Sequence, residues 1–226
     1  MPRRTVPLTA GEYYHLYNRG HNRARVFLDK ENYVYFLQEL RRYLVPDHAL
    51  LVAYVLMPNH YHMLIRACSA TLSRAMQRLG ISYTKSINKR YDRTGGVFQG
   101  AFQAKHVDRD EYLLHLSRYI HLNPLRARLV ERAEHWAFSS YPEYVGLRNG
   151  TLPRADEVLA QLVEERLTHL RQHGRRRSQT SEVFKTSEVC SRIPPELLPE
   201  ARARYRAFVE AYRPSERRHI EHLLFP

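Results

Sequence analysis

The 226-residue chain has few cysteines, one tryptophan, a shortage of acidic side chains and no long hydrophobic run. Its two cysteines, Cys68 and Cys190, are far apart in sequence and form no disulfide framework, which fits a reducing compartment. The longest apolar stretch, Ala49 to Met57, is far too short to cross a bilayer, and the N-terminus has no apolar signal-peptide core. We therefore expect a soluble, cytoplasmic protein with no membrane partner.

The shortage of acidic residues leaves the chain strongly basic. Lys and Arg number 36 against 23 Asp and Glu, which gives a formal net charge of +13 at pH 7. Such a charge favours a polyanionic partner, most simply nucleic acid. The 16 tyrosines include rings that could stack on unpaired bases, although most serve packing. The alternative is a basic protein without such a partner.

Apolar periodicity predicts strand, helix, strand, strand, helix and strand, in that order. The strands are expected at 12–19, 49–56, 61–66 and 97–107, and the helices at 30–45 and 71–91. This is the order of the ferredoxin-like βαββαβ fold, an α+β class with an antiparallel sheet and helices on one face. An added helix over 109–123 is expected to start with a capping box of Asp108 and Glu111 and to end before Pro124.

Beyond residue 130 the sequence changes character. We expect a first domain over 1–146 and a helical C-terminal extension with a basic linker over 147–226. A packed loop at 136–146 ends the first domain, and the extension is predicted to contain a polar helix at 155–172, a basic linker at 173–181 with Arg175, Arg176 and Arg177, and a helix at 196–212. The three arginines could contact phosphates or only keep the linker solvated.

Two histidines stand two residues apart at the start of the third strand. Side chains at this spacing point to the same face of a strand, so the imidazoles of His60 and His62 can converge on one point. A divalent metal is the usual group that two imidazoles share. The alternative is a hydrogen-bonded pair of histidines without metal.

A tyrosine and an asparagine on the added helix could complete this site. Tyr119 and Asn123 are four residues apart and project from one face. The amide oxygen of Asn123 suits Mg²⁺ or Mn²⁺, and three ligands leave coordination positions open for catalysis. A metal beside a phenol suggests phosphoryl transfer to the tyrosine. Alternatively, Tyr119 is a core residue and Asn123 only ends the helix.

At these motifs the chain resembles a known family. MPNHYHMLI, residues 57–65, resembles the His-hydrophobe-His motif of HUH single-strand nucleases. RYIHLNPLRARLV, residues 118–130, resembles the tyrosine block of REP-associated tyrosine transposases, bacterial relatives of the single-strand insertion-sequence transposases. YYHLYNRG, KRYDRTGGVFQGAF and WAFSSY fit the same family in the same order, so the resemblance covers roughly residues 12–146.

The resemblance implies an HUH fold, a divalent metal (Mg²⁺ or Mn²⁺) and cleavage of single-stranded DNA beside a hairpin through a 5′-phosphotyrosine. Two positions depart from the family pattern: Tyr61 replaces the usual aliphatic residue between the histidines, and Ala101 stands where many relatives have Arg. By position, the resemblance assigns His60, His62 and Asn123 as metal ligands and Tyr119 as the nucleophile.

Basic side chains gather in two places that could contact DNA phosphates. One group lies on a single face of the 71–91 helix, where the alternative is an ordinary solvated helix face, and the other follows the first strand. The candidate DNA-binding residues are Arg19, Arg23, Arg25, Arg74, Arg78, Lys85 and Lys89.

The sequence therefore favours a metal-dependent transposase or endonuclease that cleaves and rejoins single-stranded DNA at a REP-type hairpin. The alternative is a hairpin-binding protein for DNA or RNA that does not cleave. One tyrosine block is present, and because REP-associated relatives are thought to act singly we expect a monomer rather than a dimer.

Overall fold

The computed structural model describes residues 6–168 and 193–224. Within this part of the chain, four strands form one antiparallel sheet in the order β2-β3-β1-β4. This order is the ferredoxin-like one, which confirms the predicted fold class. The strands are β1 (Tyr13–Arg19), β2 (Ala49–Met57), β3 (His60–Ala67) and β4 (Gln103–Val107).

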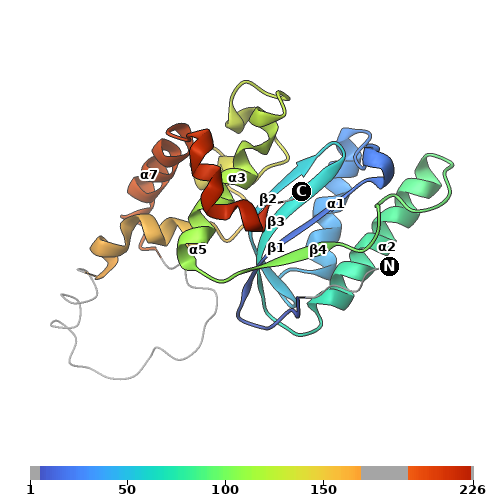
Figure 1. The fold of residues 1–226 in the computed structure, drawn as a ribbon, viewed down its shortest axis with the longest axis horizontal. Helices are drawn as coiled ribbons and strands as arrows, with labels where there is room; N and C mark the ends of the chain where they lie inside the picture. Colours follow the sequence, from blue (N-terminus) through green and yellow to red (C-terminus); the bar gives the residue numbers. More distant parts are fainter. Residues whose placement is uncertain (1–5, 169–192, 225–226) are drawn as a thin grey trace.

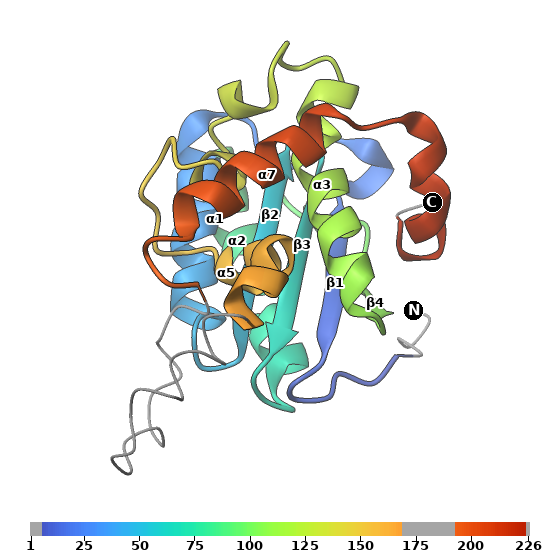
Figure 2. The same ribbon diagram turned by 90° about the vertical axis from the view of Figure 1, so that its left-hand side faces the viewer.

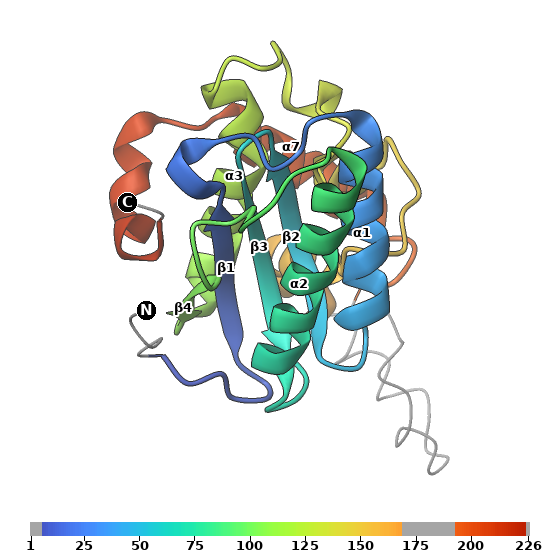
Figure 3. The same ribbon diagram turned by 90° about the vertical axis from the view of Figure 1, so that its right-hand side faces the viewer.

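Helices cover both faces of the sheet and create two cores (Figure 1). The helices α1 (Lys30–Tyr43) and α2 (Leu72–Arg90) lie on the face that Figure 3 presents. The opposite face, seen in Figure 2, is covered by α3 (Asp110–Arg126), α5 (Asp156–Leu159) and α7 (Leu198–Glu210). The two helices of the βαββαβ unit thus share one face, as predicted, and the added helix takes the other.

The pleat of β3 explains how residues 61–64 contribute side chains to both cores. Successive residues of a strand point to opposite faces, so Tyr61 and Met63 of β3 join the core under α1 and α2. Between them, His62 points to the face of Leu64, which belongs to the core under α3. The bulky Tyr61 is 2% exposed and its ring lies 5.2 Å from Phe36 and 5.9 Å from Phe98 between centroids. Its size is therefore used for packing, away from the histidines.

The start of α1 and the buried side of α2 can both be explained by their local sequences. α1 starts with a capping box in which the Asp29 carboxylate accepts from the backbone of Asn32 and the Asn32 side chain accepts from the backbone of Asp29. The amphipathic pattern of α2 matches its packing, because the predicted apolar stripe is buried. That stripe consists of Leu72, Met76, Leu79, Tyr83 and Ile87.

The fourth strand and the start of α3 differ from the sequence prediction. β4 begins at Gln103 instead of residue 97, and the preceding segment contributes only a bridge between Phe98 and Gly20. The predicted capping box of Asp108 and Glu111 is also wrong, because the N-cap is Arg109 and has no side-chain cap. The carboxylate of Glu111 instead lies 3.6 Å from the Arg109 guanidinium.

The predicted end of α3 before Pro124 is wrong as well, since the helix continues to Arg126 with Pro124 inside its last turn. Proline has no N–H to donate to the carbonyl four residues earlier, here that of Ile120. The side-chain nitrogen of Asn123 lies 3.4 Å from this oxygen and 2.8 Å from the carbonyl oxygen of Tyr119. The amide thus compensates for the missing donor, which allows the helix to pass through the proline.

The segment 136–146 is packed, as predicted, and it covers the free edge of β2. The carbonyl of Phe138 accepts from Leu56, and Ser140 donates its backbone N–H to Tyr54. The indole N–H of Trp136 donates to the carbonyl of Leu56 at 3.0 Å. An exposed strand edge can pair with other chains, so this cover protects the sheet.

The C-terminal elements differ from the predicted helices within the described residues. Of the helix expected at 155–172, the described part up to residue 168 consists of α5, the 3₁₀ turn η3 (Ala160–Val163) and a helical turn at 164–168. α7 spans 198–210 of the predicted 196–212, and the 3₁₀ segment η4 (Pro214–Leu223) follows it. The proposed linker with Arg175, Arg176 and Arg177, and Cys190, lie outside the described residues.

No helix in the described part of the chain is long and apolar enough to cross a membrane.

A buried histidine of α3 joins the C-terminal extension to the segment that covers the edge of β2. The Nδ1 of His121 lies 2.7 Å from the hydroxyl of Tyr205 on α7, and its Nε2 lies 2.7 Å from the Ser140 hydroxyl. His121 is fully buried, and burial lowers its pKa to about 3. The folded protein therefore keeps this ring neutral in mildly acidic solution.

This buried ring predicts a loss of stability in mild acid. Below the ordinary pKa of 6.5 the unfolded chain takes up a proton at His121, whereas the folded chain does not until about pH 3. Between pH 7 and pH 5 this site should lower the free energy of unfolding by about 2 kcal/mol. Urea unfolding at both pH values should show a correspondingly smaller drop for His121→Gln. Equal drops in the two proteins would contradict the assignment.

The accommodation of Pro124 can be tested by a double-mutant cycle. Asn123→Ala should destabilise the wild type more than it destabilises Pro124→Ala, because alanine at 124 supplies the N–H that the Ile120 carbonyl lacks. The coupling energy between the two sites should be about 0.5–1 kcal/mol by denaturant unfolding. A coupling energy of zero would mean that the Asn123 amide does not serve this carbonyl.

Candidate active site

The two histidines of β3 lie together on the face that α3 covers. The ring centroids of His60 and His62 are 5.0 Å apart and their planes meet at 81°. His62 is 1% exposed, whereas His60 is partly buried near the end of the sheet. The two imidazoles therefore share one face, as their spacing predicts, and His60 is the more exposed of the two.

Tyr119 of α3 lies against this pair. Its ring centroid is 5.8 Å from that of His62, and the rings meet edge to face at 76°. α3 packs across β2 and β3, which brings a residue 57 positions further along the chain (119 − 62) to the histidine. The guanidinium carbon of Arg126 lies 5.4 Å from the centre of the Tyr119 ring. The structure thus brings Tyr119 to the pair of histidines that the sequence assigned to the same site.

Asn123 stands one helical turn after Tyr119, and its contacts orient the amide. Because its nitrogen donates to backbone carbonyl groups of α3, the side-chain oxygen is the atom that a cation would bind. An amide oxygen is a ligand suited to Mg²⁺ or Mn²⁺. The proline that follows therefore helps to determine which end of this amide is available.

Burial keeps both histidines of the pair neutral at pH 7. The pKa of His60 is lowered to about 4, mainly by burial and further by the nearby Arg19 guanidinium. The pKa of His62 is lowered well below 6.5, mainly by burial. An imidazole must be unprotonated at the nitrogen that binds a metal, so these environments favour ligation.

The phenol of Tyr119 is set between opposing influences. Burial raises its pKa above 10, whereas the guanidinium groups of Arg126 and Arg217 and the side chain of Asn123 act to lower it. Burial has the larger effect, so the phenol is protonated at neutral pH. Arg217 comes from η4, which means that the C-terminal extension contributes charge beside this tyrosine.

The donor set fits a divalent cation of the catalytic kind. Within residues 6–168 and 193–224, no group of three or more His, Cys, Asp or Glu side chains is arranged to hold a metal. Two imidazoles and an amide oxygen form a different set, which suits borderline and hard cations and leaves coordination positions for a substrate. His60, His62 and Asn123 are the residues that would hold such an ion.

A third histidine belongs to the site, and sequence reasoning missed it. His15 of β1 is fully buried, and its Nε2 lies 2.9 Å from Nδ1 of His62. The register of β1 on β3, in which His15 faces Leu64 and Tyr17 faces His62, creates this contact. Alternation along β1 places His15 on the face of Tyr17, but the pairing of the strands cannot be read from the spacing of residues within one strand.

The basic residues predicted to bind DNA lie in two separate places. Arg19 is the cross-strand partner of His60, and the exposed Arg23 and Arg25 follow it in the loop after β1. The Arg23 carbonyl accepts from Asn59, which precedes β3, so this group borders the histidine pair.

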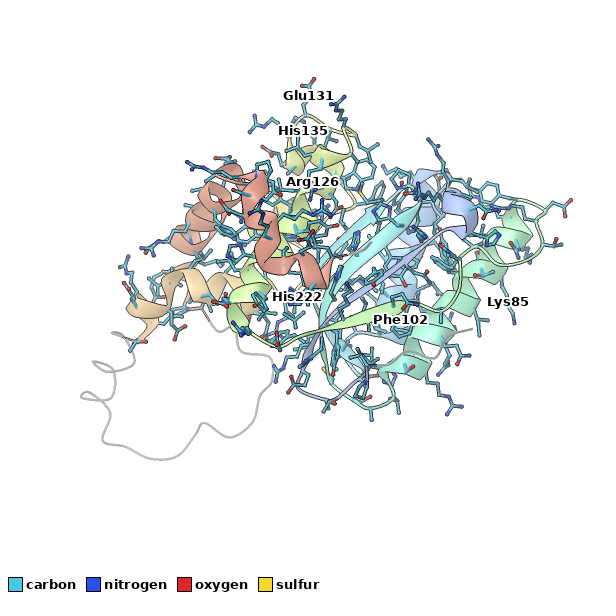
Figure 4. The ribbon with its side chains drawn as sticks, in the orientation of Figure 1. Lys85, Phe102, Arg126, Glu131, His135 and His222 are labelled. Atoms are coloured by element: carbon cyan, nitrogen blue, oxygen red, sulfur yellow. The ribbon has the colours of Figure 1, made fainter. Side chains whose placement is uncertain are left out.

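The second group lies on the far layer of the molecule. Its four side chains are exposed on α2, on the face of the sheet opposite α3. Figure 4 shows Lys85 on α2, well apart from Arg126 on α3 and His222 in η4. The other members are Arg74, Arg78 and Lys89.

Comparisons with known proteins agree with this geometry. The profile of the family described as "Transposase IS200 like" matches residues 9–123, just over half of the chain, and this span includes β1 to β4, the histidine pair, Tyr119 and Asn123. No curated protein matches the sequence.

A solved structure described as a REP-associated tyrosine transposase bound to a REP hairpin is similar in fold, with a TM-score of 0.54. The two sequences are 15% identical, and the similarity covers 68% of this chain and 97% of the other. The fold of that protein is therefore present here almost in full, with additional residues in this chain.

Proposed function

Because the chain belongs to the family of IS200-like transposases, we propose that it is a metal-dependent endonuclease and strand transferase for single-stranded DNA. Tyr119 is the nucleophile, and the intermediate is a 5′-phosphotyrosine. The observation that carries this proposal is the packing of the Tyr119 ring against His62, 5.8 Å between centroids, at a donor set suited to Mg²⁺ or Mn²⁺.

The reaction exchanges one phosphodiester for another. The phenol oxygen of Tyr119 bonds to the scissile phosphorus as the bond from phosphorus to the 3′ oxygen breaks, and the strand leaves with a 3′-hydroxyl. The energy of the bond is kept in the phosphotyrosine, so another 3′-hydroxyl can reverse the step and join strands. A cation held by His60, His62 and Asn123 would supply charge neutralisation at the phosphate.

The surroundings of Tyr119 suit a nucleophile that is activated only when substrate is bound. Its pKa is raised by burial, so the phenol resists losing its proton at neutral pH. Arg126 and Arg217 stabilise the phenolate as it forms, and a neighbouring phosphate would meet the same two positive charges. The phenol loses its proton to solvent as its oxygen bonds to phosphorus, and the leaving 3′ oxygen takes up a proton, so the forward step is balanced in protons.

We propose that the DNA partner is a hairpin with single-stranded flanks, since the solved transposase of similar fold is bound to a REP hairpin. Arg19, Arg23 and Arg25 border the histidine pair and suit the phosphates next to the scissile bond. The exposed cations of α2 form a second basic face on the opposite layer, which suits the duplex stem.

RNA binding on the open sheet, as in RNA-recognition modules, is disfavoured by the packing. Such modules stack bases on a sheet face that is free of helices. Here both faces are buried under helices, and β2 and β3 are buried along most of their length. The remaining alternative is a hairpin-binding protein that does not cleave.

The covalent step can be tested with DNA hairpins labelled at the 3′ end and flanked by randomised single strands. In Mg²⁺ or Mn²⁺ the wild type should form an adduct that survives denaturing electrophoresis, because the tyrosine keeps the 5′ phosphate of the labelled fragment. Tyr119→Phe should form none and still bind the hairpin. Tyr112→Phe on the same helix is the matched control and should form the adduct. Hairpin binding without adduct in either metal would favour the non-cleaving alternative.

The role of α2 can be tested through the salt dependence of hairpin binding. Each phosphate contact that is removed should lower the slope of log K against log salt by about 0.7–0.9. Arg74→Gln and Arg78→Gln should each show this loss, with no change in adduct yield at saturating DNA. Arg204→Gln on α7 removes the same charge from the opposite layer and should leave the slope unchanged. Unchanged slopes for both α2 variants would make this face an ordinary solvated surface.

A further inference from the structure

The buried contact between His15 and His62 is part of a chain of hydrogen bonds that ends at the C-terminal segment. Nδ1 of His15 lies 2.6 Å from the carbonyl oxygen of Leu223, and Nε2 lies 2.9 Å from Nδ1 of His62. The ring centroids are 5.1 Å apart and the ring planes meet at 28°, which suits an edge-to-edge contact between the two nitrogen atoms. The proposed reaction assigns no step to His15.

The chemistry of these atoms determines where the protons are. A carbonyl oxygen only accepts, so the proton of His15 is on Nδ1. A second proton would place a cation in a fully buried position beside Lys105, at a high cost in free energy, so Nε2 carries a lone pair. That lone pair accepts a hydrogen bond, and Nδ1 of His62 must then be the donor. The lone pair of the neutral His62 ring is therefore on Nε2.

The other histidine of the pair is oriented in the same sense. Nδ1 of His60 lies 2.6 Å from the side-chain oxygen of Asn59, which acts as an acceptor. His60 therefore also has its proton on Nδ1 and its lone pair on Nε2. The two rings present the same nitrogen, although different residues impose this state on each.

The carbonyl of Leu223 is held in place by its neighbours. The ammonium group of Lys105, the cross-strand partner of His15, donates to the carbonyl oxygens of His222 and Leu224 at 2.7 Å each. The side chains of Leu223 and Leu224 are buried in the core under α3. The cross-strand neighbours His15 and Lys105 thus bind the backbone carbonyl groups of residues 222–224, which fixes the position of the Leu223 carbonyl.

We propose that His15 is a positioning residue that holds His62 in its Nδ1–H form. The C-terminal segment 214–224 contributes to the metal site indirectly, because the Leu223 carbonyl accepts the proton of His15 and so determines which nitrogen of His62 is protonated. This inference rests on the proposed function, because it concerns the ion that His60, His62 and Asn123 would hold. The side chain at position 15 must donate to the Leu223 carbonyl with one atom and accept from Nδ1–H of His62 with another. Only a side chain that can do both fixes the tautomer of His62 in this way.

The first test observes the proton directly. In metal-free, ¹⁵N-labelled protein, the imidazole nitrogen shifts should show His62 as the Nδ1–H form in the wild type. In His15→Phe, which keeps a flat ring and has no hydrogen-bonding atoms, the Nε2–H form should become populated. A wild-type His62 with its proton on Nε2 would overturn the proposal without any measurement of DNA cleavage.

The second test measures the affinity of the DNA-free protein for Mn²⁺ alone by calorimetry. His15→Phe should weaken binding about 10-fold or more, which is the usual effect of removing a partner of a metal-ligating histidine. His15→Gln can still donate and accept and should lose less. Lys105→Met, which releases the carbonyl groups without touching either ring, should also weaken binding. His106→Phe, an exposed histidine on the same strand as Lys105, is the control and should bind as the wild type does.

Failure of the proposed metal site and failure of the role of His15 would give different results. A wild type that binds no Mn²⁺ would overturn the metal site of the proposed function, and this inference with it. A wild type that binds Mn²⁺ and variants of His15 and Lys105 that bind it equally well would overturn the inference alone. If His15→Phe fails to fold, His15→Gln and Lys105→Met decide the question by the same two measurements.

Discussion

The packing of α3 against the sheet is the constraint on which the rest of the site depends. The strand pleat directs His60 and His62 to this face, and α3 brings Tyr119 to them, with Asn123 one helical turn further along. The face is otherwise lined by apolar side chains of β2 and β3, whose burial under α3, α5 and α7 holds the helix in place. The geometry of the proposed site and the stability of the second core therefore depend on the same packing of α3.

Most of the fold and the four central residues of the site could be predicted from local periodicity. A spacing of two on a strand and of four on a helix each fix a shared face, which is why His60, His62, Tyr119 and Asn123 were found. Whether these four residues act as proposed stays a prediction until the adduct and the metal are measured.

Features that depend on contacts between distant residues could not be predicted in this way. His15 reaches His62 through the register of two strands, and the Leu223 carbonyl reaches His15 across almost the whole chain. The rule that a helix ends before proline failed at Pro124 because the preceding Asn123 replaces the missing donor. The capping box of Asp108 failed because the N-cap of α3 is one residue later, at Arg109, and the genuine capping box lies at Asp29, before α1.

The hydrogen bond between His15 and the Leu223 carbonyl joins residues 208 positions apart, and this separation has a consequence for synthesis of the protein. Chains emerge from the ribosome with the N-terminal part first, so the sheet and α3 are complete before residue 223 has been added. A nascent chain therefore has the histidine pair and the tyrosine, but His15 has no carbonyl to bind. The hydrogen bond from His15 to the Leu223 carbonyl therefore forms late, after every other described element has left the ribosome.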